Sequence, residues 1–203
     1  MSPRPRLDHV RRPELLAAAA SVIRRRGLEN ARVADIADEA GTSAPSVLYW
    51  FASKGELLKE ALTSAELRFY EDLAVELEGL ESARDRLLLI VQRSSGDGDY
   101  DAALWMELWA RALRDPELAA TRAELDGRWR RAIAGVVRYG QERGEFGPAD
   151  PEEFAVLLAA LLDGLAVQIA LRDMEVTPDR VRELALKLAE RELGCELLEG
   201  ARL

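Results

Sequence analysis

The chain has 203 residues, of which 48% are hydrophobic and 32% charged, a balance typical of soluble globular proteins with one sizeable core or two small ones. Its single cysteine, Cys195, excludes an intramolecular disulfide and suits a reducing compartment. The first ten residues contain no apolar stretch of the kind that a secretory signal needs, so we expect a cytoplasmic protein.

The charge is unevenly distributed along the chain. The total is −9 at pH 7, which taken alone argues against a nucleic-acid partner. Residues 1–55, however, hold nine basic against six acidic side chains, a net charge of +3, which leaves −12 on residues 56–203. Such an asymmetry is expected if only the N-terminal part meets a polyanion, although a chance fluctuation of a few charges gives the same pattern.

Apolar residues recur at spacings of three and four along the whole chain, and no alternating stretch is bounded by turn residues. The sequence therefore predicts an all-α fold of about nine helices. Several helices start at a proline that follows Asp or Thr, and glycines such as Gly27 and Gly41 mark helix ends. The predicted helices span residues 11–26, 33–40, 43–51, 54–77, 83–92, 100–113, 116–143, 151–171 and 178–193.

The first three helices form a candidate helix-turn-helix, because two short helices meet at Gly41 and an amphipathic helix precedes them. In the third helix Val47, Trp50 and Phe51 lie at i, i+3 and i+4, and we expect them to face inward. Small residues at the exposed start of a helix let its backbone approach a surface closely, and the DNA major groove admits such a helix. The inward residues expected of the first helix are Leu15, Leu16, Ala19, Val22 and Ile23; the outer side of the third carries Ala44, Pro45, Leu48 and Tyr49.

Several motifs lie in register across residues 11–58: a first helix that ends in Arg26-Gly27, then VADIADEAG, then S-x-x-S-V-L-Y-W-F-x-S-K-x-x-L. Together they resemble the DNA-binding domain of TetR-family transcriptional regulators, which implies such a domain over residues 1–57. The chain has Arg32 where the family commonly has a capping Thr, so Arg32 itself is a candidate phosphate contact. The resemblance implies base-facing roles for Ser43, Ala44, Pro45 and Ser46, and phosphate contacts for Leu48, Tyr49 and Lys54.

The outer face of the third helix carries no Arg, Lys, Asn or Gln, the side chains that make bidentate contacts with guanine or adenine. We therefore hypothesise that Ala44 and Pro45 meet thymine methyl groups, and that hydroxyl groups and groove shape supply the remaining specificity. Arg4 and Arg6 would form an arm over a neighbouring minor groove, unless the N-terminus is a disordered tail.

Three C-terminal stretches, LWMELWARALRDPEL, LLDGLAVQIAL and TPDRVRELALKLAEREL, resemble the C-terminal domain of BetI-like members of the same family. The resemblance implies a small-molecule sensor over residues 58–203 and a homodimer formed by the last two long helices. A stripe of small residues at every fourth position allows close packing of helices, although packing within one chain would give the same pattern. The expected dimer contacts are Leu157, Ala160, Leu161, Gly164 and Gln168.

Residues 154–171 are almost wholly apolar and approach the length of a membrane span. Asp163 interrupts this run, and an acid in the middle of a membrane helix costs about 2.5–3.5 kcal/mol on insertion scales. We therefore expect a helix that is buried within the protein, and no membrane partner.

Aromatic side chains beside an acid can enclose an organic cation, and several aromatic residues of the C-terminal part are candidates for a ligand pocket. Trp105 and Trp109 lie at i and i+4 and share a helix face. The alternative is that these residues belong to the core, with Glu107 paired to Arg111 on the surface. The candidate pocket residues are Phe69, Tyr70, Trp105, Trp109 and Trp129.

The sequence thus predicts a ligand-responsive transcriptional repressor that binds an inverted-repeat operator in double-stranded DNA as a homodimer and is released by a small organic effector. The alternatives are a constitutive or activating DNA-binding module without a ligand, and an all-α enzyme. For an enzyme, His9 is the single histidine and lies far in sequence from Cys195, and no phosphate loop or metal-ligand cluster is found. We expect neither a cofactor nor a metal.

Overall fold

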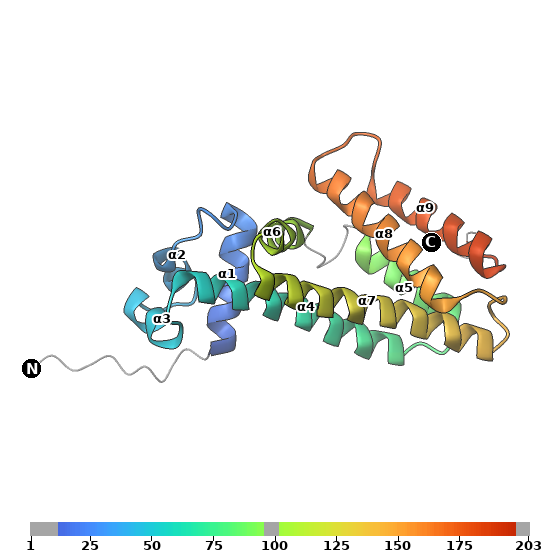
Figure 1. Ribbon diagram of the computed structural model, residues 1–203, viewed down its shortest axis with the longest axis horizontal. Helices are drawn as coiled ribbons and strands as arrows, with labels where there is room; N and C mark the ends of the chain where they lie inside the picture. The colour runs from blue at the N-terminus through green and yellow to red at the C-terminus, as the bar shows by residue number, and fades with distance from the viewer. Residues whose placement is uncertain (1–11, 96–101, 198–203) are drawn as a thin grey trace, which may run out of the picture. The chain divides into compact units, whose positions relative to one another are not determined.

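The structure is a computed structural model, and it describes residues 12–95 and 102–197. Over these residues the chain forms nine α-helices and no strand, which confirms the predicted all-α fold (Figure 1). Each predicted helix is present, with ends within two residues of those expected. The helices are α1 (Arg12–Arg26), α2 (Val33–Glu39), α3 (Ala44–Trp50), α4 (Lys54–Glu78), α5 (Ala83–Ser94), α6 (Ala102–Ala112), α7 (Pro116–Glu142), α8 (Pro151–Ala170) and α9 (Pro178–Leu193).

The described residues divide into two compact units. We call those within Met1–Arg68 and Ala103–Thr121 the head unit, and those within Phe69–Ala102 and Arg122–Leu203 the body unit. The long helices α4 and α7 contribute residues to both units. The head unit also contains α6, which lies far from the first helices in sequence. A functional boundary after residue 57 stays a prediction.

In the head unit α1 packs on α2, and α2 packs on α3. All five α1 residues that were expected to face inward are buried. Gly27 and Gly41 close the turns after α1 and α2 with φ values of 74° and 65°, a left-handed conformation that a residue with a side chain adopts only with strain. Ser43 begins α3, because its side chain accepts a hydrogen bond from the backbone N–H of Ser46 at 3.3 Å.

The inner face of α3 differs from the prediction at Trp50. Val47 is fully buried and Phe51 is 1% exposed, but Trp50 is 40% exposed, so the expectation that it faces inward was wrong. The reason is that Phe51 leaves the helix in an extended conformation (φ −131°, ψ 128°), and its ring takes the interior position. Trp50 instead lies edge-on to Tyr49, with ring centroids 5.8 Å apart.

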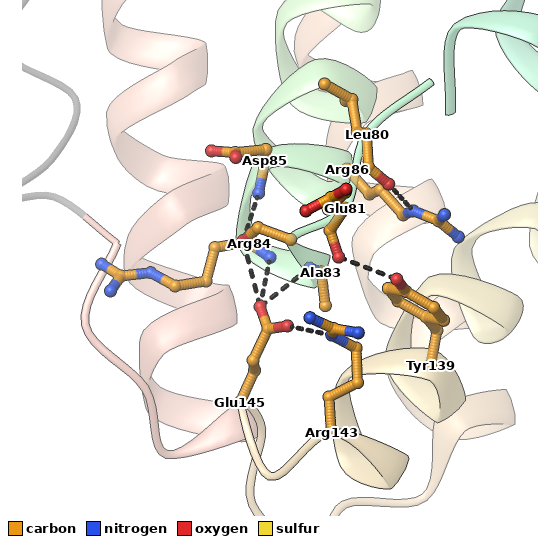
Figure 2. Close-up of polar contacts among 10 residues, drawn as sticks. Leu80, Glu81, Ala83, Arg84, Asp85, Arg86, Tyr139, Arg143 and Glu145 are labelled. Atoms are coloured by element: carbon orange, nitrogen blue, oxygen red, sulfur yellow. Dashed lines mark hydrogen bonds and ion pairs between the residues drawn. The ribbon is translucent and has the colours of Figure 1, made fainter. Parts of the chain in front are cut away.

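In the body unit α5, α8 and α9 pack on one another around a hydrophobic core. Glu145 fastens the loop after α7 to the start of α5, as Figure 2 shows. One of its oxygens accepts the backbone N–H groups of Ala83 and Arg84 at 2.8 and 3.2 Å, and the other accepts Nε of Arg143 at 2.8 Å. A carboxylate at this position satisfies N–H groups that have no partner within the helix and complements the helix dipole.

Helix α8 is long and apolar enough to cross a bilayer by length and composition, a test that the core helix of a soluble protein also passes. Seven of its residues are buried in the body unit, from Phe154 to Ala166. Its start is fixed by Asp150, whose side chain accepts the N–H groups of Glu152 and Glu153 at 2.9 and 3.0 Å. One side of α8 therefore belongs to the core.

Candidate functional site

The outer side of α3 is exposed, and buried side chains on its inner side hold the helix in place. Leu48 is 49% exposed and Tyr49 is 69% exposed, on a helix whose opposite side is held by the buried Val47 and Phe51. Pro45 lies in the first turn, where its missing N–H costs nothing and its fixed φ favours a helix. The predicted base-facing and phosphate-facing residues of α3 thus share one presented surface.

The two serines of this surface contact each other. The hydroxyl oxygens of Ser43 and Ser46 lie 2.9 Å apart, and that of Ser43 also caps the helix. A hydroxyl has one donor and two acceptor positions, so each oxygen still has capacity for a further hydrogen bond. Ala44, between them, is half-buried and presents only a methyl group.

Many basic side chains of the head unit are engaged in ion pairs. Arg12 lies 2.6 Å from Glu60, and Arg26 lies 2.7 Å from Asp35. Arg25 lies 2.7 Å from Glu39, and its hydrogen bond lowers the pKa of that carboxyl group to about 2. The positive charge counted from the sequence therefore overstates what is available to a polyanion.

Arg32 and Lys54 occupy different settings. Arg32 precedes α2, is exposed, and has no ion-pair partner among residues 12–95 and 102–197. Lys54 begins α4 and donates from Nζ to the backbone carbonyl of Glu29 at 3.3 Å. Ser53 caps α4 as predicted, because its hydroxyl accepts the N–H of Glu56 at 3.1 Å. Arg4 and Arg6 lie outside the described residues, as does His9.

The aromatic candidates for the ligand pocket fall into two groups. In the body unit Phe69, Tyr70 and Trp129 form one cluster, with ring centroids 5.5–6.3 Å apart. In the head unit Trp105 and Trp109 of α6 form an edge-to-face pair with centroids 6.1 Å apart. Trp105 and Trp129 are each 8% exposed.

Two carboxyl groups of the body unit were not selected as site residues from the sequence. Asp126 of α7 forms an ion pair with Arg122 at 3.1 Å. It lies three positions before Trp129, so the two side chains are on the same side of α7. Asp163 of α8 is largely buried, and burial raises its pKa to about 6, with a further rise from the nearby Asp126 and a smaller opposite effect of Arg122. Burial also raises the pKa of Asp126. The signal for Asp163 was its position as the acid inside an apolar run.

The predicted dimer stripe lies on the outer side of α8. Leu157 is 42% exposed, and Ala160, Gly164 and Gln168 are exposed, whereas Leu161 is half-buried against the body core. A Cβ atom added at Gly164 would meet no atom within 4 Å. The stripe is therefore an open small-residue surface on a helix whose other side is fixed in the core.

Glu107 does not pair with Arg111, which corrects that expectation. Its Oε1 accepts the backbone N–H of Leu28 at 3.2 Å, a contact within the head unit. The side chain is half-buried, and it satisfies a donor in the turn that follows α1.

Two family models match the chain. Residues 15–61 match the model for bacterial regulatory proteins of the tetR family, and residues 83–194 match the model for the C-terminal domain of BetI-type transcriptional repressors. The chain belongs to the TetR family. The HTH-type transcriptional regulator BetI of Cronobacter sakazakii is 28% identical over 201 residues, which cover 95% of each chain.

Solved structures of transcriptional regulators agree with the fold. A transcriptional regulator of Saccharomonospora viridis, crystallised in complex with choline, is 31% identical with a TM-score of 0.80, over 90% of this chain and 96% of that one. A TetR-family regulator from Rhodococcus is 29% identical with a TM-score of 0.74, over 90% and 97% of the two chains. TetR-family proteins are transcriptional regulators rather than enzymes, so the predicted regulator is confirmed and the enzyme alternative is set aside.

Proposed function

We propose that this TetR-family protein is a cytoplasmic repressor that binds an inverted-repeat operator as a homodimer and is released by a small organic effector. The observation that carries the DNA-binding part is the exposed outer side of α3, from Ser43 to Tyr49, on a helix anchored by Val47 and Phe51. A short rigid helix with small residues at its start is suited to the major groove.

Direct reading of bases is expected to be limited. The outer side of α3 offers methyl and hydroxyl groups from Ser43, Ala44, Ser46 and Tyr49, with the Pro45 ring among them. Leu48, Arg32 and Lys54 are proposed to lie along the phosphates. Sequence-dependent groove shape then supplies much of the specificity.

Selection of host genome fragments by the purified protein, followed by sequencing, tests this function. We expect an inverted repeat whose half-sites are separated by about 34–36 Å or a multiple, and binding that weakens steeply with salt. Retention of all double-stranded fragments alike at moderate salt would contradict the proposal. Operator mutants add a second test, because losses dominated by guanine positions would contradict the limited direct readout.

The homodimer is proposed to form through the α8 stripe, with Leu157, Ala160 and Gly164 against a second copy and Leu161 and Gln168 at its margin. The exposed Gly164 favours this arrangement, because a partner helix can approach a position without a side chain closely. An effector that favours a dimer with wrongly spaced DNA-binding domains would then weaken both half-site contacts together.

The proposed effector is a quaternary or tertiary ammonium compound. Asp126 and Asp163 provide two poorly solvated carboxyl groups near Arg122, and Trp129 lies one turn from Asp126 with Phe69 and Tyr70 around it. Aromatic faces and carboxylates both attract such a cation. The choline bound by the Saccharomonospora viridis relative supports the same class. A pocket role for Trp105 and Trp109, which belong to the head unit, stays a separate prediction.

Titration of tryptophan fluorescence with choline and with its neutral carbon isostere, 3,3-dimethylbutan-1-ol, tests the effector class. We expect choline to bind at least about tenfold more tightly, and Asp163→Asn to remove most of this preference. Equal affinity for the two compounds would reject the cationic class. If neither compound binds and operator binding persists, the constitutive DNA-binding alternative is favoured.

A further inference from the structure

A groove in the body unit is lined by residues of α4 and α7 and by Arg86 of α5. Its volume is about 490 Å³, within the range of small-molecule sites. Buried or half-buried apolar side chains form its floor, and exposed or half-buried arginines line its edge. The floor includes Leu73, Leu77 and Val136, and the edge includes Arg86, Arg128 and Arg131.

The groove runs along the C-terminal half of α7. Its α7 residues run from Arg128 to Tyr139, which corresponds to about 16 Å along the helix axis. Arg131 is two positions after Trp129, and two positions correspond to about 200° around a helix, so these two side chains point in different directions from α7. The groove shares Tyr70 with the aromatic cluster, but its lining includes neither Asp126 nor Asp163.

Arg86 is held in place at the end of the groove near Tyr139 (Figure 2). Its Nε donates to the backbone carbonyl of Leu80 at 2.9 Å, and its guanidinium carbon lies 3.8 Å from the ring centroid of Tyr139. Tyr139 is itself fixed, because its hydroxyl donates to the carbonyl of Glu81 at 2.7 Å. The terminal nitrogens of Arg86 make no ion pair within the described residues. Because the guanidinium group is held in place, these two nitrogens are already oriented to donate hydrogen bonds to a carboxylate or phosphate.

The other two arginines leave the groove with excess positive charge. Arg131 has no ion-pair partner among the described residues, and Arg128 lies 2.9 Å from Glu124 in an exposed pair that contributes little stability. This positive edge belongs to a part of the chain whose net charge is strongly negative. A guanidinium cluster beside an apolar floor complements a molecule with an anionic end and an aliphatic chain.

We propose that this groove binds an amphipathic anion, a single aliphatic chain that ends in a carboxylate or phosphate. The chain lies on Leu73, Leu77 and Val136, and the anionic group accepts hydrogen bonds from the terminal nitrogens of Arg86. Arg128 and Arg131 raise the positive potential along the same edge. A floor of about 16 Å accommodates a chain of about ten carbons.

Calorimetric titration of the full-length Asp163→Asn protein, in which the proposed ammonium site is weakened, tests the proposal with three probes of equal chain length, all below their micellar concentrations: decanoate, decyltrimethylammonium and decanol. We expect decanoate to bind at least about tenfold more tightly than the other two. Decyl phosphate is titrated in parallel, and whichever anion binds more tightly identifies the head group. Equal or tighter binding of decyltrimethylammonium overturns the proposal.

Variants then locate the site. Arg86→Gln is expected to weaken decanoate binding about tenfold and leave decanol unchanged. Arg138→Gln is the control, because Arg138 does not line the groove and pairs with Glu152, and it should change neither. Gly135→Leu fills the groove without a steric clash in the fold, because a Cβ there meets no atom within 4 Å, and it should abolish decanoate binding. Decanoate binding that survives both Arg86→Gln and Gly135→Leu overturns the assignment.

Discussion

Glu107 of α6 accepts a hydrogen bond from the backbone N–H of Leu28, a residue 79 positions earlier in the chain. Gly27, immediately before Leu28, has a positive φ, and a Cβ atom there would lie 3.5 Å from Oε1 of Glu107. The turn after α1 thus depends on a carboxylate from α6. This contact explains in part why α6 belongs to the head unit rather than to the body unit that contains α5 and α9.

Glu107→Ala is therefore expected to lower the free energy of unfolding by about 1–3 kcal/mol, because it leaves a half-buried N–H without an acceptor. Glu107→Gln keeps an acceptor oxygen and should cost about 1 kcal/mol or less. Urea denaturation monitored by circular dichroism measures both. Glu117→Ala in α7 serves as the control, since Glu117 makes only an exposed pair with Lys59 and its loss should change stability by less than about 0.5 kcal/mol.

Arg32→Ala is expected to weaken operator binding and to reduce the slope of log affinity against log salt by about 1, the change expected for one lost phosphate contact. The side chain makes no ion pair within the described part of the chain, so stability should be unchanged. Binding isotherms at several salt concentrations measure the slope. Arg180→Ala in α9 removes the same charge from the body unit, and an equal change of slope there would show that only net charge matters.

Asp163→Asn is expected to stabilise the protein at neutral pH but not in acid. Burial, with Asp126 nearby, raises the folded-state pKa of Asp163 to about 6, above its ordinary value of 3.8. Between these two pH values the folded state binds more protons than the unfolded state, so the contribution of Asp163 to stability falls as the pH rises.

At pH 7.5 the ionised group then costs the folded state on the order of 1–3 kcal/mol, which Asn removes. Thermal denaturation of the two proteins at pH 4 and pH 7.5 measures this difference. A stabilisation of equal size at both pH values would show that it does not arise from titration of Asp163. A buried acid that lowers stability is typical of a functional position, which agrees with the proposed cation site.

Gly140→Ala is expected to destabilise the body unit although alanine is the better helix former. A Cβ atom at this position would overlap the ring of the core residue Phe146, with Cε2 only 2.6 Å away. Overpacking of this kind costs about 1–3 kcal/mol. Gly135→Ala in the same helix is the matched control: its Cβ meets nothing within 4 Å, and it should gain about 0.5–1 kcal/mol in urea denaturation.

The helices could be predicted from the sequence because local signals fix them. Pro116, Pro151 and Pro178 begin α7, α8 and α9, and Gly194 ends α9 with a φ of 60°. Contacts between distant segments could not be predicted in this way. The spacing rule for a helix suggested Arg111 as the partner of Glu107, because it considers only neighbours in the same helix, whereas the structure joins Glu107 to Leu28.

The candidate sites also differ in whether they depend on one segment or on contacts between distant segments. The exposed side of α3 followed from motifs within one short segment, but Asp126 and Asp163 come from two helices, and periodicity within one helix does not indicate that they lie near each other. Trp50 shows the limit within a segment, because α3 ends one residue before Phe51 and the change of backbone conformation decides which aromatic ring is buried.

Gly164→Leu is expected to dissociate the proposed homodimer and leave the folded protomer intact. Within one protomer a Cβ at Gly164 meets no atom within 4 Å, so the larger side chain should cost the protomer nothing and improve helix propensity by about 0.8–1 kcal/mol. Between two α8 helices it would instead keep the stripes apart. Sedimentation velocity measures the association state, and circular dichroism checks the fold. Gly135→Leu is the control, since it adds the same side chain to an open position of α7 outside the stripe and should leave the dimer unchanged. A Gly164→Leu protein that remains dimeric would place the interface elsewhere.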